Sequence, residues 1–378
     1  MVDQMLRELG FKKIINGAGH FTKYGGSCPD ARVVKAMADA SSHWVDMAAL
    51  EVSAGKMLSK MVGCADGLVT AGAYSSSTIA AHTALAMAKQ RGARTSTPNI
   101  VIQRSHITPY AEAYRTGGIV LKEIARKSPS DSLLDQIDES TVAVAYVVNE
   151  SEFEFNLDEC VAACRRRGIP VLVDASVVDP AVRGIREILA HDPDLVAVSG
   201  GKGFNGPNSS GLLLGRSEVI ALARSLSFPN YGPGRGMKVS KEEIVGLLVA
   251  VELALRDQDT IVEAWQKRVK QIQDALDGIE HVRTQVFFPW RLNFPQPIPR
   301  LVVYIEKPDG EAIAERVRQG LETENPPVWT RTLADVTKDK NVIVIDVRTL
   351  SNSDVRVLAE SLRFQIKRAL AAPLAARA

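Results

Sequence analysis

Lys202 is the residue of this 378-residue chain whose setting points most directly to chemistry. It lies in Ser199-Gly200-Gly201-Lys202-Gly203, directly after the apolar run 195–198. A lysine in a glycine-rich loop at the end of a buried strand is poorly explained as a solubilising charge. We interpret it as an amine placed to form a Schiff base with a carbonyl compound.

Asp174 is the first possible partner of such a site. It ends the run 170–173, so we expect it at the carboxyl end of a strand, where open α/β sheets bind ligands. It precedes Lys202 by 28 residues, enough for one helix and one strand, so adjacent strand ends would bring the two together. A carboxylate here would keep a pyridine nitrogen protonated. The alternative is that Asp174 only caps a helix.

A candidate phosphate-binding turn lies at 70–77, between a short strand and a helix. Gly72, Ala73 and Tyr74 begin this helix, where backbone N–H groups and the helix dipole favour an anion. Ser199 and Gly201 of the lysine loop are further candidates for binding the same cofactor. Small residues at a helix start are common, so this pattern is weak when taken alone.

His106 and Asn149 follow two further strands. His106 comes after the strand 100–103 and is placed to stack on a ring, although it could be an exposed loop histidine. Asn149 ends the strand 142–148 and could hydrogen-bond a phenolic oxygen; Glu150 could do so instead, or both could cap the loop. An amine, an acid, a phosphate turn and a stacking ring together indicate pyridoxal 5′-phosphate (PLP).

Two nucleotide-binding motifs overlap the lysine loop and are rejected. Residues 201–206 match G-x-G-x-x-G, but a dinucleotide fingerprint opens a helix, and here an apolar strand-like run follows at 211–215. The Walker A motif fails because neither Ser nor Thr follows Lys202.

Composition bounds the class of protein. Hydrophobic residues make up 46% and charged residues 24% of the chain, as in ordinary globular proteins. The net charge of +2 argues against a nucleic-acid partner, and no apolar run approaches the roughly 20 residues needed to span a bilayer. The start of the chain is not typical of a signal peptide. Its four cysteines form no metal-ligand pattern, and we expect a cytoplasmic protein with no bound metal.

The order of the patterns predicts an α/β protein. Strands are expected at 67–70, 100–103, 118–121, 142–148, 170–174, 195–199 and 211–215, with helices at 76–88, 156–167 and 182–190. Apolar strands that alternate with helices favour a mostly parallel seven-stranded sheet. The last two strands have no helix between them and could pair antiparallel. A long helix from 240 to 276, strands at 301–305 and 342–346, and a helix at 353–370 predict a smaller C-terminal α+β domain.

The assembled residues resemble fold-type I PLP-dependent enzymes, and among them the selenocysteine-synthase-like group. The resemblance covers roughly residues 12 to 365. Its motifs are Ile15-Asn16-Gly17-Ala18-Gly19 with Gly25-Gly26-Ser27, Glu51 with Ala54-Gly55, the run from Ser199 through Gly206-Pro207 to Ser210-Gly211, and Met237-Lys238-Val239-Ser240-Lys241-Glu242-Glu243. It implies the PLP-dependent transferase (aspartate aminotransferase-like) fold, with an N-terminal segment 1–48 on the small domain, a PLP-binding domain 49–239 and a small domain 240–378.

The resemblance also implies roles for single residues. Lys202 would be the Schiff-base lysine, Asp174 the pyridinium partner and His106 the stacking residue. Such enzymes build their sites between subunits, which implies a homodimer or a higher homo-oligomer, and Arg235 could reach the neighbour's site. Arg348 resembles the arginine that binds a substrate carboxylate in related aminotransferases.

The substrate itself is left open by the sequence. Arg331 is a rival to Arg348, and both could be surface charges. His20 lies in a stretch that looks individual to this chain. The selenium transferase of the group carries an N-terminal extension for tRNA, whereas the first shared motif of this sequence already begins at Ile15, so we expect no tRNA substrate.

We therefore predict a PLP-dependent lyase that removes the α-proton of an amino acid or amino-sugar acid and eliminates a β-substituent. Aminotransfer, racemisation and aldol cleavage begin in the same way and remain alternatives. A selenium transferase acting on seryl-tRNA, or a protein that binds PLP without chemistry, is less favoured.

Overall fold

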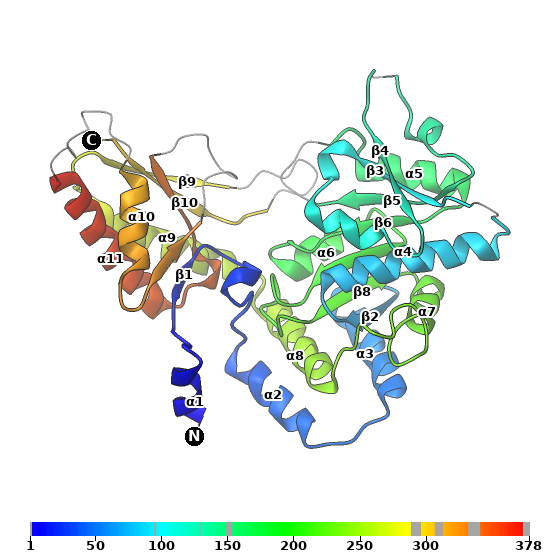
Figure 1. Ribbon diagram of the computed structural model, residues 1–378, viewed down its shortest axis with the longest axis horizontal. Coiled ribbons are helices and arrows are strands. Elements are labelled where there is room, and N and C mark those ends of the chain that lie inside the picture. Colours follow the sequence, from blue (N-terminus) through cyan, green and yellow to red (C-terminus); the bar gives the residue numbers. More distant parts are fainter. Residues whose placement is uncertain are drawn as a thin grey trace. The chain divides into compact units, whose positions relative to one another are not determined.

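The computed structural model describes residues 2–93, 96–128, 130–148, 153–288, 296–306, 313–331 and 341–372. The chain forms two compact units, which Figure 1 shows in ribbon form. The sheet unit consists of Gly25–Asp259 and Trp290–Gln296, and the terminal unit consists of Met1–Tyr24, Thr260–Pro289 and Pro297–Ala378. Each unit has its own hydrophobic core.

A seven-stranded sheet organises the sheet unit, in the order β2-β8-β7-β6-β5-β3-β4. Its strands are β2 (Asp66–Thr70), β3 (Asn99–Gln103), β4 (Val120–Ile124), β5 (Thr141–Val147), β6 (Val171–Asp174), β7 (Leu195–Ser199) and β8 (Gly211–Gly215). β8 runs antiparallel to both of its neighbours, and the other pairs are parallel. The predicted mostly parallel sheet and its antiparallel pair around the lysine loop are confirmed. β4 lies later in the chain than the strand expected at 118–121.

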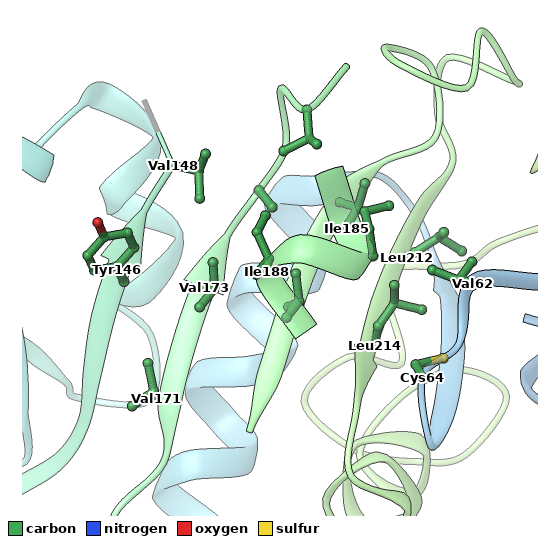
Figure 2. Close-up of a cluster of buried hydrophobic side chains, with 14 of the residues drawn as sticks. Val62, Cys64, Tyr146, Val148, Val171, Val173, Ile185, Ile188, Leu212 and Leu214 are labelled. Atoms are coloured by element: carbon green, nitrogen blue, oxygen red, sulfur yellow. The ribbon is translucent and has the colours of Figure 1, made fainter. Parts of the chain in front are cut away.

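Helices cover both faces of this sheet because its strands are apolar on both sides. One face packs against α3 (Met47–Val62), α5 (Leu157–Arg167), α6 (Ala181–Leu189) and α8 (Lys241–Asp257). Figure 2 shows this core, in which Val173 of β6 and Leu212 of β8 lie with Ile185 and Ile188 of α6. The other face packs against α4 (Ala73–Gln90), α7 (Ser217–Ser225) and the short helix η3 (Pro109–Tyr114).

The single long helix expected from 240 to 276 is two helices in the structure. α8 ends at Asp257, and α9 (Ile261–Leu276) begins after a turn in the other unit. α8 stays with the sheet unit because Ile244 and Leu247 are buried in its core, where the helix also packs on α2 (Ala31–Ser41). The compact units thus divide near residues 24 and 259, whereas the domains predicted from the sequence divide at 48 and 239.

The terminal unit is the predicted smaller α+β part. Its three-stranded sheet has the order β12-β10-β9, and β1 pairs with β11 in a second sheet. Its elements are α1 (Val2–Glu8), β1 (Ile15–Gly17), α9, β9 (Val282–Phe287), β10 (Arg300–Ile305), α10 (Ala314–Glu322), β11 (Val328–Thr330), β12 (Val342–Asp346) and α11 (Asn352–Ala371). Ile15 is buried in this core, so the start of the chain is an integral part of the unit.

Candidate active site

Strand register brings the predicted site residues to one edge of the sheet. Asp174 of β6 pairs with Val147 of β5 on one side and with Ala197 of β7 on the other. Ser199 of β7 pairs with Gly211, which also pairs with Thr70 of β2. The residues that follow these strand ends therefore share one edge, and Lys202 and Gly72 are among them.

The alternation of side chains decides which face the polar residues occupy. Val173 and Val198 belong to the core shared with α6, whereas Leu172 and Ala197 belong to the core shared with α4. Because successive residues of a strand point to opposite faces, Asp174 and Ser199 both face the α4 side. The acid, the serine and the start of α4 thus lie on one side of the sheet.

The N-terminus of α4 is open and lies against backbone. Gly72 precedes the helix with φ of 91° and ψ of 165°, and no side chain of the described residues caps the helix at this position. A Cβ on Gly211 would lie 2.5 Å from the carbonyl carbon of Gly72 and 2.8 Å from the nitrogen of Ala73. The first N–H groups of α4 therefore border a turn that only glycine permits, and this arrangement suits an anion.

His106 is buried at the same edge, in the short helix η2 (Arg104–His106) that follows β3. Its Nδ1 accepts a hydrogen bond from the N–H of Val147 at 3.2 Å, so this ring nitrogen carries no proton. Its ring meets Tyr146 edge to face, with 4.6 Å between the ring centroids. Burial lowers the pKa of His106 to about 4, so the ring is neutral at neutral pH. The alternative of an exposed loop histidine is wrong.

The lysine loop lies close to a tyrosine that sequence reasoning missed. Lys202 is half-buried, and its Nζ lies 5.8 Å from the centroid of the Tyr110 ring. Asp174 in turn accepts a hydrogen bond at 2.9 Å from the N–H of Ser176, which fixes one carboxylate oxygen. Tyr110 lies in the short helix η3, after the helix of His106, and no sequence pattern points to its place beside Lys202.

Tyr114 is a second residue that sequence reasoning missed. Its side chain is buried in the core between the sheet and α4. Burial, and then the carboxylate of Asp174, raises the pKa of the Tyr114 phenol, while the hydroxyl of Ser77 acts in the opposite direction. Asp174 is therefore electrostatically coupled to a buried neutral phenol.

Asn149 and Arg235 are the remaining predicted site residues between β5 and α8. Asn149, with Glu150, lies outside the described residues. Arg235 packs its guanidinium near the rings of Phe228 and Tyr231, at 5.2 and 5.6 Å from their centroids. Its Nε is buried without a hydrogen-bond partner among the described residues. Tyr231 is 95% exposed, so this aromatic cluster ends at the surface of the chain.

His20, Arg331 and Arg348 belong to the terminal unit. Arg348 donates to both carboxylate oxygens of Asp346, with Nε to Oδ1 at 2.9 Å and Nη2 to Oδ2 at 2.7 Å. Both side chains are buried, so Arg348 is not a surface charge. The guanidinium of Arg331 lies 5.1 Å from the centroid of the Phe21 ring.

Asp346 lies at the centre of a group of basic side chains, Arg348, Arg300 and His20, which we call the basic cluster. Arg300 is also buried, and its Nε lies 3.7 Å from Asp346 Oδ2. Burial alone would raise the pKa of Asp346, but Arg348, then Arg300 and His20, hold it well below its ordinary value. Asp346 is therefore ionised, and several cationic or titratable groups gather around one carboxylate.

The residues of the sheet unit fit PLP by their chemistry. The cofactor needs an amine for its aldehyde, an acid for its ring nitrogen and donors for its phosphate. Lys202, Asp174 and the open start of α4 offer these groups at one sheet edge. Gly211 packs so closely against the turn at Gly72 that no other residue fits there, which keeps the start of α4 beside the end of β8.

Comparisons with known proteins agree with this architecture. A D-glucosaminate-6-phosphate ammonia lyase of Salmonella typhimurium (strain 14028s / SGSC 2262) is 29% identical over 294 residues, 74% of this chain and 78% of that protein. A 5′-C-glycyluridine monooxygenase-decarboxylase of Streptomyces sp is 30% identical over 286 residues, 71% of this chain and 68% of that protein. No family model matches the chain.

Solved structures extend the comparison to almost the whole chain. A structure of D-glucosaminate-6-phosphate ammonia-lyase matches with a TM-score of 0.79 at 25% identity, covering 97% of this chain and 98% of the other. A NifS-like protein matches with a TM-score of 0.60 at 14% identity, over 95% of this chain and all of the other, which supports the fold alone. The fold and the site edge define a fold-type I PLP-dependent enzyme. The chain belongs to the selenocysteine-synthase-like group of that family, as the sequence motifs predicted.

Proposed function

We propose that this enzyme binds PLP through Lys202 and eliminates ammonia from an anionic amino acid or amino-sugar acid. The observation that carries the proposal is the convergence of Lys202, Asp174 and the open N-terminus of α4 at one sheet edge. The ammonia-lyase relatives, matched in sequence and in structure, favour this reaction among those that begin with the same proton removal.

Bound PLP would supply an aldehyde for the substrate amine and a ring that accepts electron density from the α-carbon. Asp174 would hold a proton at the ring nitrogen, and the buried, neutral phenol of Tyr114 is electrostatically coupled to it. The start of α4, with Ala73, Tyr74 and Ser199, would bind the phosphate. His106 would cover the ring as a neutral side chain, because its pKa of about 4 leaves it unprotonated.

Lys202 would have two tasks in turn. Its amine would hold the cofactor between turnovers. Once the substrate amine has taken its place, the neutral Nζ of Lys202 would remove the α-proton as general base. Tyr110, whose ring lies 5.8 Å from Nζ, would limit the positions of the free amine.

The basic cluster around Asp346 is our candidate for recognition of the substrate anion. Arg348 and Arg300 are buried around a single ionised carboxylate, which favours a further anion nearby. Arg331, His20 and Arg235 are the other candidate substrate residues. In the proposal Arg348 binds the substrate carboxylate, and its paired hydrogen bonds to Asp346 hold the guanidinium in one orientation.

One observation favours a second candidate reaction. The Streptomyces relative is a monooxygenase-decarboxylase, so relatives of this chain also include an enzyme that consumes oxygen and releases carbon dioxide. An oxygen electrode distinguishes the two, because elimination of ammonia consumes no oxygen. Aminotransfer and racemisation are distinguished by their products in the same reaction mixtures.

We also propose a homodimer, or a higher homo-oligomer, in the cytoplasm. Large exposed aromatic side chains such as Trp44 and Tyr231 support self-association. No helix within the described part of the chain is long and apolar enough to cross a membrane. Equilibrium sedimentation of the purified chain tests the assembly, and a monomer across the micromolar range would refute it.

The proposed reaction is tested with purified protein loaded with PLP and offered D- and L-amino acids and amino-sugar acids. We expect release of ammonia and a keto acid, without oxygen uptake, and loss of both products in Lys202→Ala. Formation of an inverted amino acid alone, or oxygen consumption that matches turnover, would replace the lyase proposal with another reaction.

A further inference from the structure

The lysine loop is rich in glycine, so its conformation depends on contacts with its surroundings. Gly200, Gly201, Gly203 and Gly206 surround Lys202, and glycine gives the backbone the greatest conformational freedom. The base of the loop is closed by hydrogen bonds from Gly200 N–H to the Ser210 carbonyl and from Gly206 N–H to the Gly200 carbonyl, both at 2.9 Å. These bonds close the two ends of the loop, and Lys202 lies between them.

Asn205 supplies such a contact. Its backbone N–H donates to the carbonyl of Lys202 at 2.9 Å, in a turn that places Asn205 at a φ of 50°. Its side-chain amide meets the backbone of Cys28 on both sides: Oδ1 accepts from the Cys28 N–H at 3.1 Å, and Nδ2 donates to the Cys28 carbonyl at 2.6 Å. A residue bonded to Lys202 is thereby clamped to a segment 177 positions away in the sequence.

The segment that receives this clamp, residues 26–28, is itself held against the loop; we call it the strap. Gly26 has a φ of 75°, and a Cβ there would lie 1.9 Å from Oδ1 of Asn208, which follows Asn205 in the same loop. A Cβ on Gly203 would likewise lie 2.3 Å from the carbonyl oxygen of Val178. The lysine loop therefore packs closely against both the strap and the Val178 segment.

We propose that Asn205 is a positioning residue for Lys202: by clamping the loop to the Cys28 backbone it fixes where the amine is presented. The inference rests on the proposed covalent role of Lys202 and adds a residue to which neither the motifs nor the comparisons assign a role. Asn205 occupies a variable position of the G-x-G-x-x-G pattern at residues 201–206. The pattern therefore does not predict that Asn205 positions Lys202.

The test uses full-length protein and three variants. Asn205→Gly keeps a residue that tolerates a positive φ and removes only the side-chain clamp, whereas Asn205→Ala removes the clamp and strains the backbone. Cys28→Ala is the matched control, because the backbone of Cys28 makes the two hydrogen bonds and its thiol makes neither. PLP is added to each protein, and three quantities are followed: borohydride trapping on Lys202, the pH midpoint of the visible cofactor band, and the thermal midpoint without cofactor.

We expect Asn205→Gly to trap PLP on Lys202 about tenfold more slowly and to shift the pH midpoint of the band, with Asn205→Ala at least as affected and Cys28→Ala like wild type. A lowered thermal midpoint alone, with unchanged trapping and band titration in Asn205→Gly, would mean a merely structural residue and would overturn the inference. If wild-type protein traps no PLP on Lys202, the proposed function fails instead, so the two failures are distinguishable.

Discussion

Glu51→Gln is predicted to stabilise the sheet unit in a pH-dependent way. Glu51 lies on α3, which packs along the edge strand β2 that leads to the turn at Gly72. Its side chain is completely buried. Burial raises the pKa of Glu51 to about 8 from 4.5, although the charge of Arg224 and a backbone hydrogen bond with Val69 oppose the rise. The folded protein therefore keeps a neutral Glu51 at a pH where the unfolded chain ionises it.

The magnitude follows from the gap between the two pKa values. Below pH 4.5 Glu51 is neutral in both states and has no effect on the pH dependence of stability. As pH rises from there towards 8, the unfolded chain loses a proton that the folded protein keeps, and stability falls by about 1.4 kcal/mol for each pH unit. The loss is about 3 kcal/mol at pH 7 and about 5 kcal/mol above pH 8. Glutamine has the same shape without this titration.

The assay is urea unfolding of wild type and Glu51→Gln at pH 5, 6, 7 and 8, with the exposed Glu187 changed to Gln as the control. We expect the stability advantage of Glu51→Gln to grow steadily with pH and the Glu187 variant to show no such trend. A stability difference that stays constant from pH 5 to 8 would refute the reasoning, since Glu51 would then be ionised in the folded protein too.

Three further changes test the site. Gly211→Ala places a methyl group 2.5 Å from the backbone of Gly72, so we expect PLP affinity to fall by at least about tenfold in an absorbance titration. His106→Phe removes a group whose pKa is about 4 in the folded protein and 6.5 in the unfolded chain. Between these pH values only the unfolded chain binds the proton, so wild type loses stability as pH falls. In thermal melts we expect this loss to be smaller in His106→Phe. Tyr114→Phe removes a buried hydroxyl coupled to Asp174, and we expect a shifted pH titration of the cofactor band with little change in the thermal midpoint.

Each of these expectations has a contrary result. Unchanged affinity in Gly211→Ala would remove the start of α4 from the phosphate site. An identical acid transition in His106→Phe would mean that the imidazole is already accessible to protons. A band titration in Tyr114→Phe that overlays that of wild type would separate the phenol from the cofactor environment.

The strand ends were predictable because continuous apolar runs are a local signal. The runs before Asp174 and Lys202 both form buried strands, and each ends at the predicted residue. A mostly parallel sheet then places both residues at one edge without further information. The positions of Asp174 and Lys202 therefore follow from their local sequence and from the rule that parallel strands end at the same edge of a sheet.

Other features depend on contacts that no local pattern reveals. The clamp of Asn205 on Cys28 spans 177 positions, and the sequence around neither residue contains a pattern that predicts the contact. The break between α8 and α9 contains neither Gly nor Pro, so the helical sequence pattern continues through it. The two helices separate because Leu247 of α8 and Trp265 of α9 are buried in different cores. The burial of Arg348 against Asp346 likewise required the tertiary structure.

The most direct test of Lys202 as the lysine that binds PLP is to reduce the PLP-treated protein with borohydride and to map the modified peptide by mass spectrometry. We expect one pyridoxyl group per chain, on Lys202, and none in Lys202→Ala. Modification of a different lysine, or a wild-type protein that stays colourless and unlabelled, would contradict this role.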